Sequence, residues 1–351
     1  MAQIANNMLD SDYDYNDTFI VTHPTYPPED LTQTTAYQWV ALCLYILVVV
    51  LGVPGNGLVV WITAFEMKRS VNTIWFLNLA VADLICCLSA SLSIMNIILG
   101  HWPLGLFACK FNSSILLINM YASVLLLTTI SIDRCALVMK PVWCQNNRTV
   151  GKAYVACAFA WILAAILSSP SFIFRNITEN NKTELCIQDY SVLGNSNQQR
   201  VENFIAIFRL LMGFIIPFLV IVTCYSTLMI RVKGRFTQNT KTMKVVLIVI
   251  IGFFACWLPY HVTGLILALN PRDSELHKST LKVDDILIAI AFMNSCINPI
   301  IYVLMGQDFK SKFKKSIRFI VKNVLAEEVS QSIDSKKSKS ISDTKNTEAS
   351  L

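Results

Sequence analysis

Asp83 is an acidic residue inside an apolar run of the sequence, residues 73–99. A carboxylate in such surroundings is costly unless it is paired, hydrated or protonated. Amide and hydroxyl side chains inside other apolar runs offer partners, and a carboxylate among such oxygens suits a small hard cation such as sodium. The pattern predicts a sodium site or, alternatively, a hydrogen-bonded structural aspartate, made by Asp83, Asn119, Ser123, Asn294 and Asn298.

Arg209 is a basic residue in a similar position, within the apolar run 203–230. A guanidinium group there needs an anion. Glu202 and Asp284 are the internal candidates for an ion pair, and an anionic group of a ligand is the other possibility.

Two further features lie at or inside apolar runs. Asp133 and Arg134 are adjacent opposite charges at the end of the run 106–138, and they indicate either a local ion pair or an arginine that contacts a partner. Pro217, Pro259 and Pro299 each remove a backbone hydrogen bond from a run. These prolines predict hinges, although membrane helices also tolerate proline without one.

The sequence does not indicate an enzyme. His23, His101, His261 and His277 form no metal-binding cluster, and the chain has neither a nucleophile elbow nor a phosphate-binding loop.

The elements that position these residues are membrane helices. Hydrophobic residues make up 54% of the 351 residues and charged residues only 15%, against about 25% in soluble domains. Each of seven apolar runs reaches the roughly 20 residues that cross a bilayer, where only helices satisfy the backbone. The sequence predicts an all-α membrane protein with a seven-helix bundle over 38–305, from runs near 38–64, 73–99, 106–138, 151–174, 203–230, 241–269 and 284–305.

Most of the 29 lysines and arginines fall on one side of this bundle, which predicts a plasma-membrane protein with an extracellular N-terminus. The net charge of +6 then reflects membrane topology and not nucleic-acid binding. Residues 1–37 contain no lysine or arginine and no apolar stretch typical of a cleavable signal peptide. We find no repeat between the two halves, which weighs against a transporter or a channel that uses Asp83.

The two ends of the chain are expected to lie outside the bundle. The acidic segment 1–37 and the serine- and lysine-rich segment 323–351 are predicted to be disordered. Residues 306–322 are predicted to form an amphipathic helix at the inner membrane surface or, alternatively, a basic disordered segment.

The predicted topology also indicates modifications. Cys109 and Cys186 are the two extracellular cysteines and can form a disulfide in that oxidising compartment. Asn16, Asn176 and Asn181 begin extracellular sequons and are predicted to carry glycans.

The chain resembles the rhodopsin-like G-protein-coupled receptors over nearly its whole length. The motifs that carry this resemblance occur in order on the expected helices: Gly55-Asn56, Asn78-Leu79-Ala80-Val81-Ala82-Asp83, Asp133-Arg134-Cys135, Trp161, Pro217, Tyr225, Phe253, Cys256-Trp257-Leu258-Pro259 and Asn298-Pro299-Ile300-Ile301-Tyr302. Cys135 departs from the tyrosine usual in that family. The resemblance implies an activation switch at Asp133, Arg134, Tyr225, Phe253, Trp257, Pro259, Asn298, Pro299 and Tyr302.

Within that family the chain resembles the chemoattractant receptors, through WFLNLAVADL (75–84), KPVWCQN (140–146) and NPIIYV (298–303). It is more similar to complement anaphylatoxin receptors than to formyl-peptide receptors, the alternative. Leu104 departs from a phenylalanine common to both groups. The resemblance implies a cationic peptide ligand, held first by sulfated Tyr13 and Tyr15 and then by Arg175, Glu202, Arg209, Tyr260 and Asp284.

The resemblance further implies a G protein of the inhibitory class, chemotaxis and inflammatory signalling of leukocytes. It also implies arrestin binding to a phosphorylated tail, with sites at Ser330, Ser332, Ser335, Ser338, Ser340 and Ser342. A non-signalling scavenger of the same ligand is a competing hypothesis, but such a protein need not keep Arg134.

Overall fold

The computed structural model of the protein describes residues 35–180, 183–231 and 240–305. Several predicted features lie outside the described residues and stay predictions: the interfacial helix 306–322, the tail 323–351 with Ser330, Ser332, Ser335, Ser338, Ser340 and Ser342, and Tyr13, Tyr15, Asn16 and Asn181.

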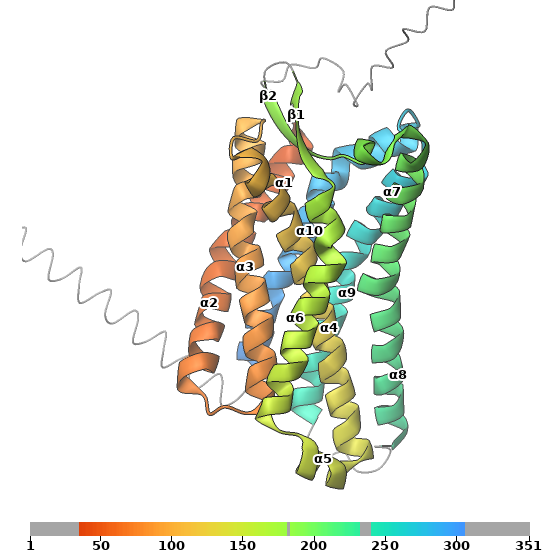
Figure 1. Ribbon diagram of the computed structural model, residues 1–351. Coiled ribbons are helices and arrows are strands. Elements are labelled where there is room, and N and C mark those ends of the chain that lie inside the picture. The colour runs from red at the N-terminus through yellow and green to blue at the C-terminus, as the bar shows by residue number, and fades with distance from the viewer. Residues whose placement is uncertain (1–34, 181–182, 232–239, 306–351) are drawn as a thin grey trace, which may run out of the picture. The chain divides into compact units, whose positions relative to one another are not determined.

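Seven long helical segments run through the described part of the chain (Figure 1). The first joins α1 (Ala36–Leu47), η1 (Val48–Gly52), α2 (Val53–Trp61) and η2 (Ile62–Glu66). Single helices form the next three, α3 (Val71–Leu99), α4 (Gly105–Met139) and α6 (Val150–Ile173). The fifth joins α7 (Asn195–Leu210), η4 (Leu211–Ile215) and α8 (Ile216–Arg231), and α9 (Thr240–Leu269) and α10 (Glu275–Met305) follow.

These helices confirm the predicted membrane bundle. Over the described residues, six segments are long and apolar enough to cross a membrane. The remaining helix, α10, packs against α1, α3 and α9 and completes the seven.

Side-chain caps determine where several helices begin. The Thr35 hydroxyl accepts from the Gln38 backbone N–H at 3.4 Å, and the Gln38 side chain accepts from the Thr35 backbone N–H at 2.9 Å, which is a capping box. Ser70 and Thr149 cap α3 and α6 through their hydroxyls. Because of the Thr35 cap, the first helix begins at Ala36, two residues before the predicted run 38–64.

Wider π-helical turns precede two of the prolines. η1 comes directly before the turn that contains Pro54, and η4 ends two residues before Pro217. A proline inside a helix removes one backbone hydrogen bond and clashes with the carbonyl four residues earlier. A wider turn before the proline accommodates both effects. Pro259 and Pro299 lie inside α9 and α10 without such a turn.

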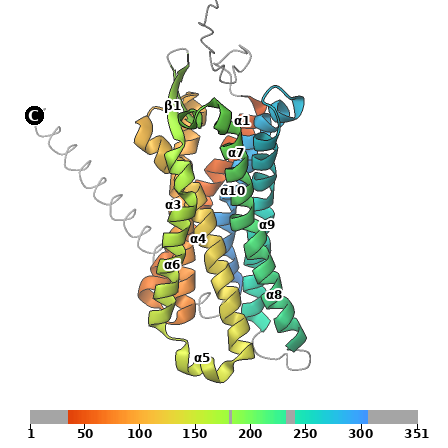
Figure 2. The ribbon, with the colours of Figure 1, turned by 45° about the vertical axis from the view of Figure 1, so that its right-hand side comes forward.

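The segment 175–202, between the fourth and fifth apolar runs, contains regular structure. β1 (Arg175–Asn180) pairs antiparallel with β2 (Thr183–Gln188), then η3 (Ser191–Leu193) leads into α7. The predicted disulfide between Cys109 and Cys186 is confirmed and ties β2 to α4, with 5.7 Å between the two Cα atoms. Figure 2 shows this hairpin at one end of the helices and α5 (Pro141–Asn147) at the other, here called the hairpin end and the α5 end.

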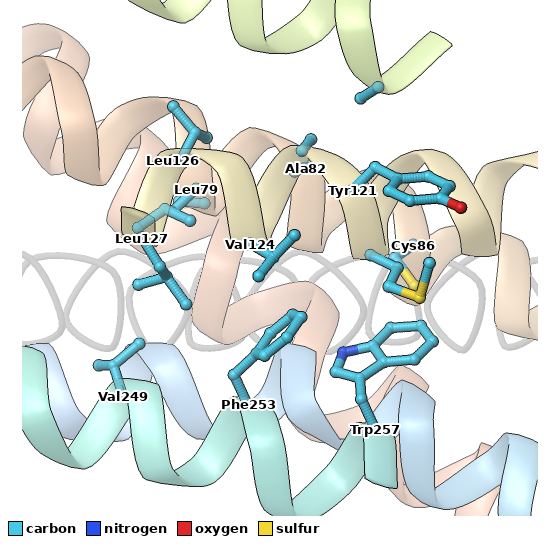
Figure 3. Close-up of a cluster of buried hydrophobic side chains, with 14 of the residues drawn as sticks. Leu79, Ala82, Cys86, Tyr121, Val124, Leu126, Leu127, Val249, Phe253 and Trp257 are labelled. Carbon is cyan, nitrogen blue, oxygen red and sulfur yellow. The ribbon is translucent and has the colours of Figure 1, made fainter. Parts of the chain in front are cut away.

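The core lies around α4, between α3 and α9 (Figure 3). Val124 and Leu127 of α4 face Phe253 and Val249 of α9. Phe253 and Trp257 are fully buried, whereas the outer faces carry many exposed large apolar side chains. Apolar residues both inside and outside are what a helix bundle in lipid requires.

Candidate functional site

A cavity of about 400 Å³ lies at the hairpin end. Its walls come from the hairpin and from α1, α3, α4, α6, α7, α9 and α10. Ligand pockets commonly measure about 300–1,000 Å³ and combine apolar walls with a few convergent polar groups. The cavity brings together four of the predicted ligand residues: Arg175, Arg209, Tyr260 and Asp284.

Arg209 is held against α9 by Tyr260. Its Nη1 donates to the Tyr260 hydroxyl oxygen at 3.0 Å, and its guanidinium carbon lies 4.9 Å from the centre of the Tyr260 ring. The absence of a side chain at Gly264 makes room for this arrangement, because a Cβ atom there would overlap Arg209 Nη2. Arg209 Nε is buried and has no hydrogen-bond partner among the described residues.

Arg175 reaches the same cavity from the first residue of β1. Its Nη1 donates to the Cys186 carbonyl oxygen at 3.3 Å, while its buried Nε lacks a partner in the described part of the chain. Burial lowers the pKa of Arg175, because the guanidinium gives up hydration. Two arginines with unused donors therefore favour an anionic group in the cavity.

Glu202 differs from its prediction. It does not line the cavity, and its carboxylate lies 3.8 Å from Arg272 Nη2. Arg148–Asp133 and Lys278–Glu275 are further ion pairs among residues 35–180, 183–231 and 240–305, and neither involves Arg209. Neither internal candidate, Asp284 nor Glu202, forms an ion pair with Arg209, whose Nη1 donates to the Tyr260 hydroxyl instead.

Sequence reasoning missed Asp285, which also lines the cavity. Asp285, Ile288 and Phe292 follow the spacing of one helix face, and all three lie in the cavity wall. That spacing could have identified Asp285 once Asp284 was chosen. The cavity consequently combines two arginines with two aspartates, a charge pattern suited to a ligand that carries both signs.

The residues around Asp83 form a second polar cluster in the middle of the bundle. Asn298 Nδ2 donates to Asp83 Oδ2 at 2.6 Å, and Asn119 Nδ2 donates to Ser295 Oγ at 3.2 Å. Ser123 Oγ donates to Asn119 Oδ1 at 3.5 Å, whereas Asn294 Nδ2 is buried without a partner among the described residues.

Two oxygens of this cluster, Asp83 Oδ1 and Asn298 Oδ1, are buried and also have no hydrogen-bond partner among the described residues. Carboxylate, amide and hydroxyl oxygens are ligands that hard cations prefer. The donor set therefore fits a sodium ion, and Ser295, which the sequence prediction omitted, contributes to the same cluster.

At the α5 end, Asp133 does not pair with Arg134. Arg148 Nε and Nη2 donate to the two carboxylate oxygens of Asp133 at 2.7 and 2.9 Å. Arg134 instead donates through Nη2 to Asn72 Oδ1 at 2.7 Å. Of the two alternatives for this pair of charges, the local ion pair is not formed, because a guanidinium 15 residues further on reaches the carboxylate in a bidentate geometry.

A chain of aromatic rings connects the cavity with the core. The rings of Tyr260 and Trp257 are 5.5 Å apart, edge to face, and those of Trp257 and Phe253 are 6.0 Å apart. Tyr225 on α8 has a buried hydroxyl without a partner in the described chain, and the Tyr302 side chain lies outside the described residues. Asn176, a predicted glycan site, is exposed on β1.

Comparisons with known proteins bear out the seven-helix fold. Residues 55–302 match the family described as 7 transmembrane receptor (rhodopsin family). The chain is 46% identical to C5a anaphylatoxin chemotactic receptor 1 of Oryctolagus cuniculus, over 92% of this chain and 93% of that receptor. It is 44% identical to the proteins of the same name from Rattus norvegicus, over 93% of both chains, and Homo sapiens, over 90% of this chain and 89% of that receptor.

Proposed function

Since the chain belongs to the rhodopsin family of seven-transmembrane receptors, we propose that it is a G-protein-coupled receptor for the complement anaphylatoxin C5a. The observation that carries this ligand is the likeness, over about nine-tenths of the chain, to receptors named for C5a. The formyl-peptide alternative has no comparable support. The signal would drive chemotaxis and inflammatory responses of leukocytes through a G protein of the inhibitory class.

The cavity would receive the C-terminus of the ligand. Arg175 and Arg209 each keep a donor that no described group uses, so together they can bind a terminal carboxylate. Asp284 and Asp285, which carry the opposite charge, would hold a cationic side chain of the same peptide. Tyr260 orients Arg209, and Glu202 acts outside the cavity through Arg272.

The ligand pose has a direct test. A short peptide ending in a free carboxylate should activate the receptor more strongly than the same peptide ending in an amide. Arg209→Ala should remove most of the difference in potency between the two peptides. The potency of the carboxylate peptide should fall by about tenfold or more, as expected when a charged hydrogen bond is lost. Arg200→Ala is the matched control, because Arg200 is exposed on the same helix and does not line the cavity.

If the Arg209→Ala receptor still distinguishes the two peptides as the unmodified receptor does, Arg209 does not bind the carboxylate. In that case Arg175 becomes the candidate, and the corresponding Arg175→Ala comparison decides between them.

The remaining parts follow from the orientation with an extracellular N-terminus. Tyr13 and Tyr15, as sulfates, would add negative charge that captures a basic ligand before its C-terminus enters the cavity. Glycans would be attached at Asn16, Asn176 and Asn181. The segment 306–322 would lie on the inner leaflet, and the phosphorylated tail would recruit arrestin.

Activation would proceed through the aromatic chain and the polar cluster. Phe253, Trp257 and Pro259 would carry the change from the cavity along α9, and Asn298 and Pro299 would carry it along α10. Sodium at Asp83, Asn119, Ser123, Asn294 and Asn298 would stabilise the resting packing. Arg134, with Tyr225 and Tyr302, would engage the G protein once released.

A further inference from the structure

Arg148 makes a short ion pair with Asp133, 2.7 Å from Nε to Oδ1, at a place the signalling scheme does not use. It directly follows α5 and precedes α6, in the connection between α4 and α6. Its guanidinium holds both oxygens of Asp133, and both side chains are mostly buried, at 22% and 13% exposure. A bidentate guanidinium–carboxylate pair is among the strongest polar contacts in proteins, especially where water is largely excluded.

Asn72 joins this pair to Arg134. A single amide oxygen, Asn72 Oδ1, accepts from Arg148 Nη2 and from Arg134 Nη2, each at 2.7 Å. Two guanidinium groups therefore converge on one neutral acceptor. The carboxylate of Asp133 is bonded to only one of them, Arg148, and Arg134 Nε is buried with no partner within the described ranges.

This arrangement makes the hold on Arg134 weak. A hydrogen bond to a neutral amide is roughly half as strong as one to a carboxylate, and the second guanidinium repels the first. If Arg148 were absent, Asp133 would have a free carboxylate directly beside Arg134 in the sequence. The Arg134 side chain would then be retained by the stronger acceptor.

We propose that Arg148 is a positioning residue that occupies Asp133 and thereby keeps Arg134 available for the G protein. The inference uses the family's coupling to G proteins and does not depend on which ligand binds. Arg148 acts through Asp133, and no contact between Arg148 and the G protein is required.

The test measures nucleotide exchange on a purified heterotrimer of the inhibitory class, with the full-length receptor in lipid nanodiscs and without ligand, and then with C5a. Arg148→Gln should lower the ligand-independent exchange rate by about fivefold. That is the effect expected when the Arg134 hydrogen bond to the Asn72 amide is replaced by a stronger one to the Asp133 carboxylate. Asp133→Asn combined with Arg148→Gln should restore exchange to the level of Asp133→Asn alone, since no carboxylate remains to retain Arg134.

Lys152→Gln is the matched control. Lys152 is an exposed cation near the same end, and its Nζ bonds only to Asn147 among the contacts that the structure describes. It should leave exchange within about twofold of the unmodified rate. Arg148→Lys, which keeps the charge but loses the bidentate geometry, should give an intermediate rate and shows whether an inactive Arg148→Gln protein is simply misfolded.

Two results would overturn the proposal. An unchanged or higher exchange rate in Arg148→Gln would mean that Arg148 does not free Arg134. A double variant as slow as Arg148→Gln alone, with Asp133→Asn still active, would mean that Arg148 contacts the G protein itself. Because the ligand-independent rate is measured separately, a receptor that ignores C5a but follows this pattern would contradict the proposed ligand and not the role of Arg148.

Discussion

At the scale of single residues, the position of Arg209 in the cavity depends on a glycine, Gly264, on the neighbouring helix α9. Arg209 belongs to α7, and its guanidinium packs against α9 where Gly264 has no Cβ atom to obstruct it. Gly264→Ala should displace Arg209, break its bond to Tyr260 and lower C5a potency by about tenfold. Concentration–response curves for nucleotide exchange measure this shift.

Gly57→Ala is the control for that change, because a Cβ atom at Gly57 meets nothing within 4 Å. It should leave the curve in place. A Gly264→Ala receptor with unaltered potency would show that the position of Arg209 against α9 is not required for binding.

Asp83 supports a second prediction at this scale. A sodium ion bound by its unpartnered oxygen would favour the resting packing, so sodium and agonist should oppose each other by linkage. C5a affinity should fall when sodium replaces a bulky inert cation, and Asp83→Asn should abolish this dependence. Equal affinity in the two salts would leave Asp83 as a hydrogen-bonded structural residue.

At the scale of elements, the hairpin positions Arg175 through its tie to α4. Removing the disulfide as Cys109→Ser with Cys186→Ser should destabilise the receptor by about 2–4 kcal/mol, seen as a lower melting temperature. It should also weaken binding of a short C-terminal peptide, because Arg175 begins β1 directly opposite the end of β2. Cys43→Ser, at an exposed free cysteine, is the control. If the variant without the disulfide binds the short peptide as tightly as the unmodified receptor does, the disulfide is not needed to position Arg175.

The helices could be predicted from the sequence to within a few residues in most cases, because lipid leaves an apolar run no other structure. The ends were less predictable: α7 begins at Asn195, eight positions before its apolar run, since polar residues can extend a helix beyond the membrane. The hairpin was missed because two six-residue strands in a polar segment carry little periodicity.

The site was predictable where a charge stood out against apolar neighbours, as with Asp83 and Arg209. It was not predictable where the partner lies far along the chain. Arg148 reaches Asp133 across α5, and Arg272 reaches Glu202 across α8 and α9, so sequence spacing identified neither of these two ion pairs.

At the scale of the whole molecule, the proposed two-part site predicts different behaviour for large and small ligands. Tyr13→Phe with Tyr15→Phe should weaken binding of intact C5a and make it less sensitive to salt, because two sulfates are lost. A short C-terminal peptide, which needs only the cavity, should bind as before. Equal losses for both ligands in a competition assay would argue against separate sites.

We propose above all that this chain is a C5a receptor that activates a G protein. The most direct measurement is nucleotide exchange on an inhibitory-class heterotrimer in membranes that contain the full chain, titrated with C5a and, in parallel, with an N-formyl peptide. We expect saturable exchange with C5a, none with the formyl peptide, and none with C5a in Arg134→Ala although that variant still binds it. Exchange driven by the formyl peptide and not by C5a would contradict the proposed function.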